Sequence, residues 1–242
     1  MIAYNDKKIE GKTKLSPSLF ATFYSNPEAW YKKAILKEGN FKGNTNTVVG
    51  TIIHKRIENY FNDEPTNAEE EFDYIETYKD NVEVDEWKVA DEVNRLWEML
   101  QIELPHMPKP TSQEQAVEFH IPNSDYYIFG TYDYTRKEDD GLVLGDIKTT
   151  SVTPKKIKFG HRVQMLLYAL AMDEKPTKME VTYIVKLKKK PTMVVITEPV
   201  EERDLQWMKD EVKKLVKRCE LAKNDDELRE LLFYRNPDSW VD

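Results

Sequence analysis

The sequence predicts an α/β protein with a central mixed β-sheet flanked by helices, and three observations predict it. Between residues 113 and 150, apolar and polar residues alternate with period two in three successive runs, which is typical of half-buried strands. The segments on either side carry apolar residues at helical spacing. No internal repeat, low-complexity tract or linker divides the 242 residues, so a single domain is the simplest interpretation.

The part of the chain before the sheet, residues 15–104, is expected to be mainly helical. Ser16 precedes a proline and so does Asn26, and each pair offers an N-cap followed by proline at the first helical position. Two short helices are therefore predicted within residues 15–36. Most of their aromatic side chains are expected in the core, although one or two could stack on bases at a surface. Longer amphipathic helices are predicted over two further ranges, 48–61 and 85–104.

The sheet core is predicted to occupy residues 113–200, and C-terminal helices the rest, residues 201–242. The first three strands form an antiparallel meander, because only the short polar turns PNSD and EDDG separate them. The expected elements are strands 113–121, 126–136 and 142–150, a helix from Thr153-Pro154 to about 172, strands 181–187 and 193–197, and helices 201–223 and 226–233.

Composition excludes several classes of protein. Hydrophobic residues make up 40% and charged residues 33%, the profile of a soluble globular chain. Cys219 is the only cysteine, so neither an internal disulfide nor a cysteine-built metal site can form. The longest apolar run, Met165 to Met172, is too short to cross a membrane, and no signal peptide is visible. We therefore expect a cytoplasmic protein, in a bacterium or a phage-infected host cell, without a membrane partner.

The net charge of −8 is unfavourable for binding nucleic acid, but the charge is uneven. Between Asp63 and Glu92 the chain has 13 acidic residues against two lysines, which leaves the remainder with a net charge of +3. One face could therefore meet a polyanion while the acidic segment lies elsewhere. The simpler interpretation of that segment is a solvated surface, and the alternatives are a partner contact or a shield for a DNA channel.

The stretch from Gly130 to Thr150 carries the chemistry. Asp133 stands at the end of one alternating run, and Asp146 and Lys148 stand two apart in the next. Side chains two apart on a strand share a face, so this aspartate and lysine project together while Ile147 points into a core. Carboxylates suit a hard cation such as Mg²⁺, and a fixed ammonium suits negative charge developing on phosphate. The stretch predicts metal-dependent phosphodiester chemistry.

A histidine and a glutamine–tyrosine pair accompany this stretch. His54 lies on the helix 48–61, one turn after Gly50, and by itself a helical histidine is more often structural than a ligand. Gln164 and Tyr168 are four apart on the later helix and therefore share one of its faces.

Taken in order, these signals form four motifs: GTIIH at 50–54, GTYD at 130–133, DIKT at 146–149 and QMLLY at 164–168. Their order and spacing resemble the RecB-type branch of the PD-(D/E)xK nuclease superfamily. That branch includes RecB and AddB nuclease domains, CRISPR-associated adaptation exonucleases, and phage and mitochondrial exonucleases. The resemblance covers residues 15 to 240 and implies a restriction-endonuclease-like core. A lone DxK is a weak signal, whereas the four motifs together are specific.

The resemblance implies roles for individual residues. His54, Asp133 and Asp146, with the backbone carbonyl of Ile147, would hold Mg²⁺ or Mn²⁺, and histidine in the set favours Mn²⁺ somewhat. Lys148 would position or activate the attacking water and stabilise the charge developing on phosphate. Whether one metal ion or two act stays open.

Gln164 and Tyr168 would contact the DNA backbone and orient the lysine. Basic and polar residues after the site are further candidates for DNA binding, with a solvated surface as the alternative: Thr149, Lys155, Lys156, Lys158, His161, Arg162 and the turn 186–190. Supporting acidic roles stay open for Glu58, Glu114 and Glu118.

The chain departs from many of these relatives, which hold an iron–sulfur cluster on four cysteines. Asn26 stands where the first cysteine would be, and the tail RNPDSWVD has none. Cluster ligation needs about four thiolates, so no iron–sulfur cluster is expected. The aromatic N- and C-terminal segments are then expected to pack together through apolar contacts. No helicase motif is present, so ATP-driven unwinding would need a helicase or recombination partner.

The function implied is a divalent-metal-dependent DNA exonuclease that favours single strands or ends, in recombination, repair or phage DNA processing. A structure-specific or restriction-like endonuclease is the first alternative. A catalytically silent DNA-binding subunit is the second, and the retention of both aspartates and the lysine argues against it. The sequence leaves polarity, pathway and oligomeric state open.

Overall fold

The structure is a computed structural model that describes residues 11–38, 43–79 and 84–234. Within these ranges one mixed sheet has six strands. Their bounds are β1 Thr13–Leu15, β2 Ser112–His120, β3 Tyr126–Glu138, β4 Gly141–Thr150, β5 Lys178–Val185 and β6 Thr192–Pro199. The prediction of an α/β fold with a mixed central sheet is thereby confirmed.

The long strand β3 organises the sheet. β2 runs antiparallel along one side of β3. The other side is shared, because β1 pairs in parallel with residues 126–128 and β4 pairs antiparallel with residues 134–138. Beyond β4, β5 is parallel to it and β6 is antiparallel to β5. The antiparallel meander predicted for the first three strands is therefore confirmed.

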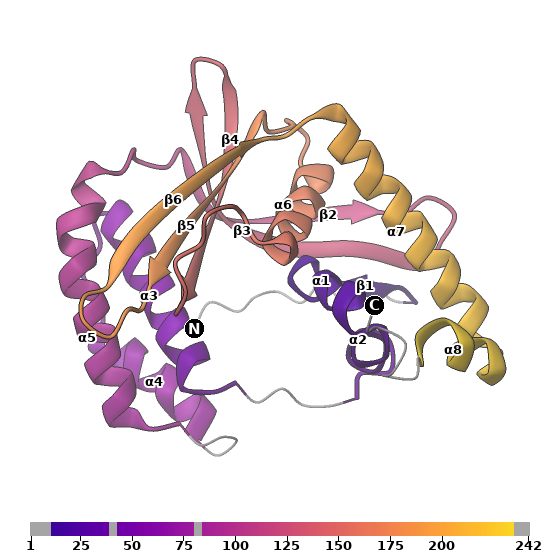
Figure 1. The fold of residues 1–242 in the computed structure, drawn as a ribbon, viewed down its shortest axis with the longest axis horizontal. Coiled ribbons are helices and arrows are strands. Elements are labelled where there is room, and N and C mark those ends of the chain that lie inside the picture. The colour runs from indigo at the N-terminus through magenta and orange to yellow at the C-terminus, as the bar shows by residue number, and fades with distance from the viewer. Residues whose placement is uncertain (1–10, 39–42, 80–83, 235–242) are drawn as a thin grey trace.

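Helices cover both faces of the sheet (Figure 1). The helices of the described chain are α1 Pro17–Ser25, α2 Pro27–Ala34, α3 Thr45–Phe61, α4 Ala68–Lys79, α5 Glu86–Glu103, the 3₁₀ helix η1 Leu104–His106, α6 Phe159–Ala171, α7 Glu202–Lys223 and α8 Asp226–Phe233. In the described ranges, no helix is both long enough and apolar enough for a membrane span.

Period-two alternation sends neighbouring strand residues into two different cores. Ile147 of β4 and Ile184 of β5 pack with α3 and α5 on one face. Tyr183 and Val185 of β5 point the other way and pack with α1, α6 and α7. The same strands are thus buried on both sides, which explains their continuous apolar runs.

The two short N-terminal helices are confirmed, and one of the two predicted caps is formed. The side chain of Asn26 accepts a hydrogen bond from the amide of Ala29 at 2.9 Å and caps α2. Ser16 stands at the N-cap of α1 but makes no side-chain cap bond. Its hydroxyl lies 2.9 Å from that of Ser18 instead.

The predicted start of the helix at Thr153-Pro154 is wrong, because α6 begins at Phe159. Tertiary hydrogen bonds hold the preceding residues in a loop. The amide of Ile157 donates to Glu198, and the amide of Lys158 donates to the Tyr183 hydroxyl at 3.1 Å. These amides are therefore satisfied outside a helix, and proline signals alone do not reveal that.

The structure differs from the prediction at three other elements, namely β1, α4 and the end of β5. β1 and α4 were not predicted, because one has three residues and the other is rich in glutamate. A bidentate pair of hydrogen bonds joins α3 to α4, in which the guanidinium of Arg56 donates to the carboxylate of Glu71 at 2.6 and 2.8 Å. β5 ends at Val185 rather than at Leu187, whose carbonyl accepts from Arg95.

The terminal helices meet in an aromatic cluster, as expected from the sequence. Phe233 at the end of α8 lies 4.3 Å from Tyr31, 6.1 Å from Trp30 and 6.3 Å from Phe23, measured between ring centroids. All four rings are buried. Apolar contact therefore joins the two ends of the described chain, while residues 235–242 of the predicted tail lie outside it.

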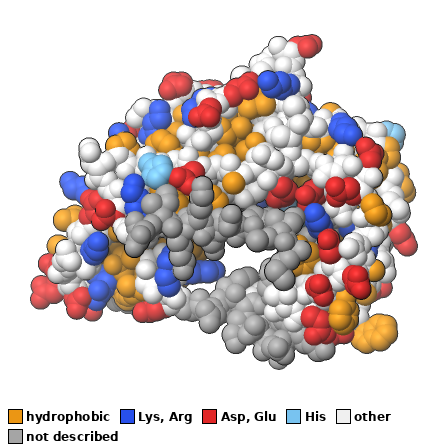
Figure 2. Space-filling model, turned by 180° about the vertical axis from the view of Figure 1, so that it is seen from behind, with side chains coloured by type: hydrophobic (Ala, Val, Ile, Leu, Met, Phe, Trp, Pro, Cys, Tyr) orange, Lys and Arg blue, Asp and Glu red, His pale blue; other side chains and the backbone are white. Residues whose placement is uncertain are grey.

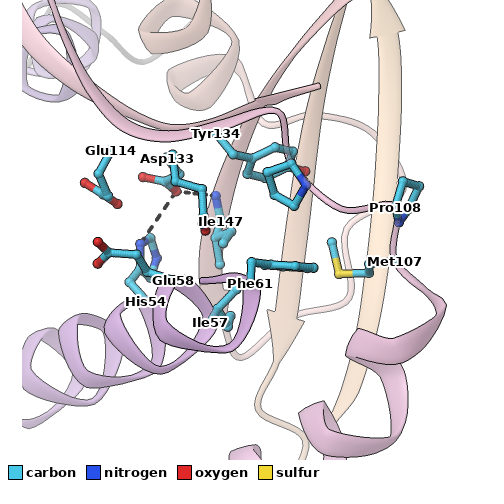
Figure 3. Close-up of a pocket in the computed structure, with 12 residues that line it drawn as sticks. His54, Ile57, Glu58, Phe61, Met107, Pro108, Glu114, Asp133, Tyr134 and Ile147 are labelled. Atoms are coloured by element: carbon cyan, nitrogen blue, oxygen red, sulfur yellow. Dashed lines mark hydrogen bonds and ion pairs between the residues drawn. The ribbon is translucent and has the colours of Figure 1, made fainter. Parts of the chain in front are cut away.

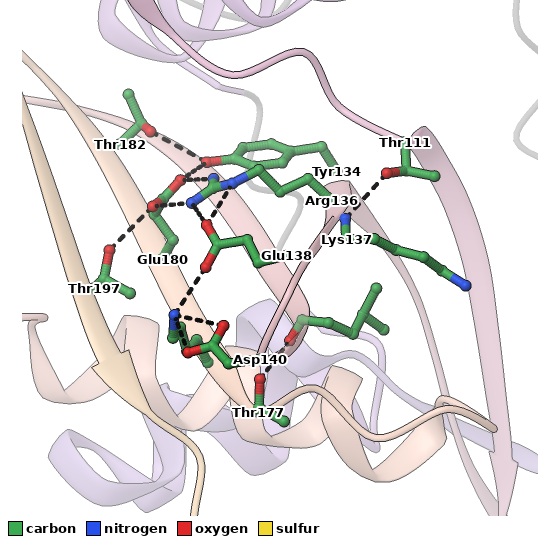
Figure 4. Close-up of polar contacts among 12 residues, drawn as sticks. Thr111, Tyr134, Arg136, Lys137, Glu138, Asp140, Thr177, Glu180, Thr182 and Thr197 are labelled. Atoms are coloured by element: carbon green, nitrogen blue, oxygen red, sulfur yellow. Dashed lines mark hydrogen bonds and ion pairs between the residues drawn. The ribbon is translucent and has the colours of Figure 1, made fainter.

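A buried polar network ties β3 to β5 (Figure 4). The guanidinium of Arg136 donates to both carboxylate oxygens of Glu180 and also to Glu138. Glu180 further accepts from the hydroxyls of Tyr134 at 2.8 Å and Thr197 at 3.0 Å. Burial opposes ionisation of Glu180, but these donors outweigh it and hold its pKa below the ordinary value.

We predict that Arg136→Met lowers the free energy of unfolding by about 3–5 kcal/mol, because it leaves the Glu180 carboxylate buried without its cation. The double variant Arg136→Met/Glu180→Leu should recover most of that loss. Urea denaturation of Arg136→Met, Glu180→Leu and the double variant measures the coupling free energy between the two side chains. Additive losses in the double variant would show that the pair is not coupled.

We predict opposite effects of alanine at two glycines. A Cβ at Gly145 would overlap the ring of Tyr134, so Gly145→Ala should cost about 1–3 kcal/mol in unfolding free energy. A Cβ at Gly50 inside α3 meets only the Thr149 hydroxyl at 3.5 Å, so Gly50→Ala should gain about 0.5–1 kcal/mol. Urea denaturation tests both, and equal stability of the two variants would contradict the described packing.

Candidate active site

The site lies where β3 and β4 separate. Their antiparallel pairing ends at Tyr134 and Gly145, so the residues just beyond it face each other across an opening. The carboxylate of Asp133 spans this opening and accepts a 2.5 Å hydrogen bond from the amide of Ile147. A side chain thus replaces a main-chain acceptor, and Asp133 is held beside Asp146.

Asp146 and Lys148 project from the same face of β4, as the alternation predicted. The ammonium of Lys148 lies 2.8 Å from the carboxylate of Asp146. Asp146 is 1% exposed, and burial together with the Asp133 charge raises its pKa to about 6, despite the opposing effect of the lysine. Burial alone would lower the pKa of Lys148, but the two carboxylates outweigh it and raise that pKa.

His54 reaches the site from α3, on the opposite side of the sheet from α6. Its Nδ1 lies 3.5 Å from the Asp133 carboxylate. Burial and the nearby Lys148 charge lower the pKa of His54 to about 4, so the ring is neutral at pH 7. A neutral imidazole has a lone pair available for a metal ion.

Gln164 and Tyr168 lie inside the protein rather than on its surface. The amide nitrogen of Gln164 donates to Asp146 at 3.4 Å and to the Tyr168 hydroxyl at 3.0 Å. Both side chains are buried. A Cβ at Gly130 would stand 2.9 Å from the Tyr168 ring and 3.0 Å from Pro17, so only glycine leaves room for this ring. The geometry thus links both residues to Asp146.

The remaining candidates for DNA binding are placed differently from one another. Lys155 and Lys156 are exposed in the loop between β4 and α6. Thr149 faces α3, with its hydroxyl near Gly50. Arg162 is held by the carboxylates of Glu198 and Asp204, so its charge is already paired.

The sequence left a supporting role open for three glutamates, and the structure places them in two different surroundings. Glu58 and Glu114 line a small cavity with His54 and Asp133, and their carboxylates turn toward the same space (Figure 3). Glu118 instead lies 2.6 Å from His120, away from the opening.

Sequence reasoning missed Tyr183, which lies beside Lys148 in the register of β4 and β5. Its hydroxyl accepts from the amide of Lys158 and lies 2.9 Å from Nδ1 of His161. Burial, with the charges of Lys148 and Lys158, lowers the pKa of His161 to about 4. A tyrosine inside an apolar strand could have drawn attention to this position. Only the strand register shows that it lies beside Lys148.

The donor types fit a hard divalent cation. Two aspartates, a neutral histidine and a backbone carbonyl converge on the opening, and the Oδ2 atom of Asp146 is buried without a hydrogen bond of good geometry. The ammonium of Lys148, 2.8 Å away, is the charged partner of this oxygen. The described side chains do not, however, bring three His, Cys, Asp or Glu groups close enough to enclose an ion.

The chain matches a family model, and solved structures superpose on it to different extents. A family model described as the PD-(D/E)XK nuclease superfamily matches residues 14–230. A solved structure described as a "putative exonuclease" from Eubacterium rectale superposes with a TM-score of 0.53 at 13% identity, covering 96% of this chain and 84% of that chain. The crystal structure of SSO0001 gives a TM-score of 0.33 at 15% identity, covering 72% and 75%.

A search of curated proteins finds no match. The Eubacterium rectale structure supports the fold, and the family match extends from β1 into α8, across the whole site. It contains every strand of the sheet and the four motifs at the opening. This chain therefore belongs to the PD-(D/E)XK nuclease superfamily.

Proposed function

We propose that this nuclease is a divalent-metal-dependent DNA exonuclease that hydrolyses phosphodiester bonds in single strands or at DNA ends. The observation that carries the proposal is the opening between β3 and β4. There the Asp133 carboxylate bonds to the Ile147 amide, and Lys148 contacts Asp146 at 2.8 Å. Recombination, repair or phage DNA processing are the pathways in which such an activity is used.

In the proposed chemistry, three side chains bind the metal ion and a fourth contacts the phosphate. His54, Asp133 and Asp146, with the carbonyl of Ile147, would hold Mg²⁺ or Mn²⁺. A cation bound there would supply neutralisation of phosphate charge and a lowered pKa of water. Lys148 donates hydrogen bonds to the phosphate oxygens as negative charge accumulates on them.

We assign Gln164 and Tyr168 to positioning rather than to the DNA contact that the family resemblance implies. Both are buried, and the Gln164 amide bridges the Tyr168 hydroxyl and Asp146. Locking the rotamer of a carboxylate that holds the metal ion favours catalysis, because small displacements of the groups around the reacting atoms are costly in rate. In this role they act on DNA through Asp146.

The whole chain is proposed to work as one nuclease domain, without an iron–sulfur cluster. α3 supplies His54, the sheet supplies the aspartates and lysine, and α6 supplies Gln164, all packed on one sheet. Buried aromatic contact at Phe233 joins the terminal helices where a cluster would otherwise join them. Unwinding of duplex DNA is left to a helicase or recombination partner.

We predict that Lys148→Ala lowers the rate of DNA cleavage by about 10²–10³-fold, because it removes the ammonium that stabilises the transition state. Release of label from end-labelled single-stranded and duplex DNA with Mg²⁺ or Mn²⁺ measures this rate. Lys137→Ala, at the hairpin end of β3, is the matched control and should cleave normally. Equal cleavage by the wild type and Lys148→Ala would place the chemistry elsewhere.

Covalently closed circular DNA separates the exonuclease from an endonuclease. An exonuclease degrades linear DNA and leaves single-stranded and duplex circles intact. Linearisation of the circles at the rate of linear DNA would instead identify an endonuclease. Substrates labelled at the 5′ or the 3′ end, with the opposite end blocked, then give the polarity.

We predict that Tyr168→Phe and Gln164→Ala reduce kcat and leave KM for DNA unchanged, since both residues act through Asp146. Loss of one hydrogen bond to a positioning group should reduce kcat by roughly tenfold. Steady-state kinetics on labelled single strands gives the two constants. A raised KM with unchanged kcat would support the DNA contact instead.

A further inference from the structure

Three aromatic side chains from three helices form a cluster on the surface. Tyr24 of α1 lies 5.1 Å from Phe159 of α6 and 6.4 Å from Trp207 of α7, measured between ring centroids. Phe159 and Trp207 are also 6.4 Å apart. We call these three residues the aromatic platform, and the helices that carry them pack together on one face of the sheet (Figure 1).

Two of the three platform rings are exposed, unlike the rings of the aromatic cluster around Phe233. Phe159 is 53% exposed and Trp207 is 37% exposed, whereas Phe233 is fully buried. Exposed aromatic rings that contact one another keep apolar faces in water, a feature typical of binding surfaces. Core packing accounts for Tyr24, which lies against the buried cluster, but not for the exposed rings of Phe159 and Trp207.

Polar contacts hold the platform in place. Arg162, one turn after Phe159, pairs with Glu198 on β6 and with Asp204 on α7. The hydroxyl of Tyr24 donates to Glu211 on α7 at 3.2 Å. These contacts fix the start of α6 against α7 and α1.

The platform lies next to the proposed active site. Phe159 is the first residue of α6, and Gln164, which bonds to Asp146, follows five residues later, about 7.5 Å along the helix axis. The loop before Phe159 begins directly after β4, and Lys158 anchors it through a 3.1 Å bond to Thr150. A strand of DNA at the site is therefore within reach of the platform.

Charge on the connecting loop matches a nucleic-acid backbone. Lys155 and Lys156 are exposed between β4 and the platform. On the described part of the back face, acidic and basic side chains are interspersed (Figure 2). Lysines that follow a backbone beside aromatic rings that accept bases are the combination used to bind single strands.

From these observations we infer that the aromatic platform stacks an unpaired base of the DNA strand whose backbone occupies the active site. Bases in a duplex already stack on each other and cannot reach the rings, so the platform selects single strands and frayed ends. This inference rests on the proposed nuclease function and adds the residues that determine its preference for single strands.

The test measures binding, separately from cleavage, in a Lys148→Ala background. Fluorescence anisotropy follows a labelled oligothymidine and an oligonucleotide of equal length that lacks its bases. Phe159→Ala and Trp207→Ala should each weaken binding of the oligothymidine by about 5- to 150-fold. Both should leave binding of the abasic strand, and the salt dependence of binding, unchanged, because phosphate contacts remain.

The controls separate loss of stacking from loss of folding. Phe159→Leu keeps an apolar side chain without a ring and should bind oligothymidine as weakly as Phe159→Ala. Trp87→Ala removes an aromatic that is 87% exposed on α5, and it should bind both oligonucleotides normally. Circular dichroism melting confirms that each variant is folded.

Two outcomes would overturn the inference: unchanged oligothymidine binding in the platform variants, or equal loss of binding for the abasic strand. Cleavage by the wild-type protein is scored independently. If the protein cleaves DNA and the platform variants bind normally, only the platform assignment fails. If it does not cleave DNA but loses base-dependent binding on substitution, the nuclease proposal fails and the platform remains.

Discussion

The hydrogen bond from the Ile147 amide to the Asp133 carboxylate is the interaction on which the rest of the site depends. Continued pairing of β3 and β4 would use that amide in the sheet ladder and leave no opening. Because a side chain takes the place of the main-chain acceptor, the strands can separate without an unsatisfied amide. The two aspartates then lie on adjacent strands at one point, with α3 and α6 approaching from opposite faces of the sheet.

Strand β3 contributes to two buried clusters of charged side chains, and the pKa of the carboxylate is shifted in opposite directions in the two. In the cluster around Arg136 and Glu180, the carboxylate accepts from a guanidinium and two hydroxyls, and its pKa is lowered. At the opening, Asp146 pairs with Lys148, but burial and the Asp133 charge outweigh the lysine and raise its pKa to about 6. A network that lowers the pKa of its carboxylate holds strands together, whereas a buried carboxylate with a raised pKa is typical of functional sites.

The two aromatic clusters show the same division of roles. The rings around Phe233 are buried. They join the terminal helices on the face of the sheet that α1 and α6 cover. The rings of Phe159 and Trp207 stay accessible near the site and contact the partly buried ring of Tyr24. Burial therefore distinguishes the aromatic residues that hold the fold from those available to DNA. The helical spacing of the N-terminal aromatics did not make that distinction.

The sequence by itself determined the mixed sheet, most of its helices and the pairing of Asp146 with Lys148, because period-two and 3.6-residue patterns are local. It also identified the four motifs that the family match contains. The loop before α6, the short strand β1 and the burial of Gln164 and Tyr168 were decided by tertiary contacts. The register that sets Tyr183 beside Lys148 was decided in the same way. Hydrogen bonds from loop amides to Glu198 and Tyr183 hold that loop, and Gly130 makes room for Tyr168. Such contacts join residues far apart in the chain, so no local pattern encodes them.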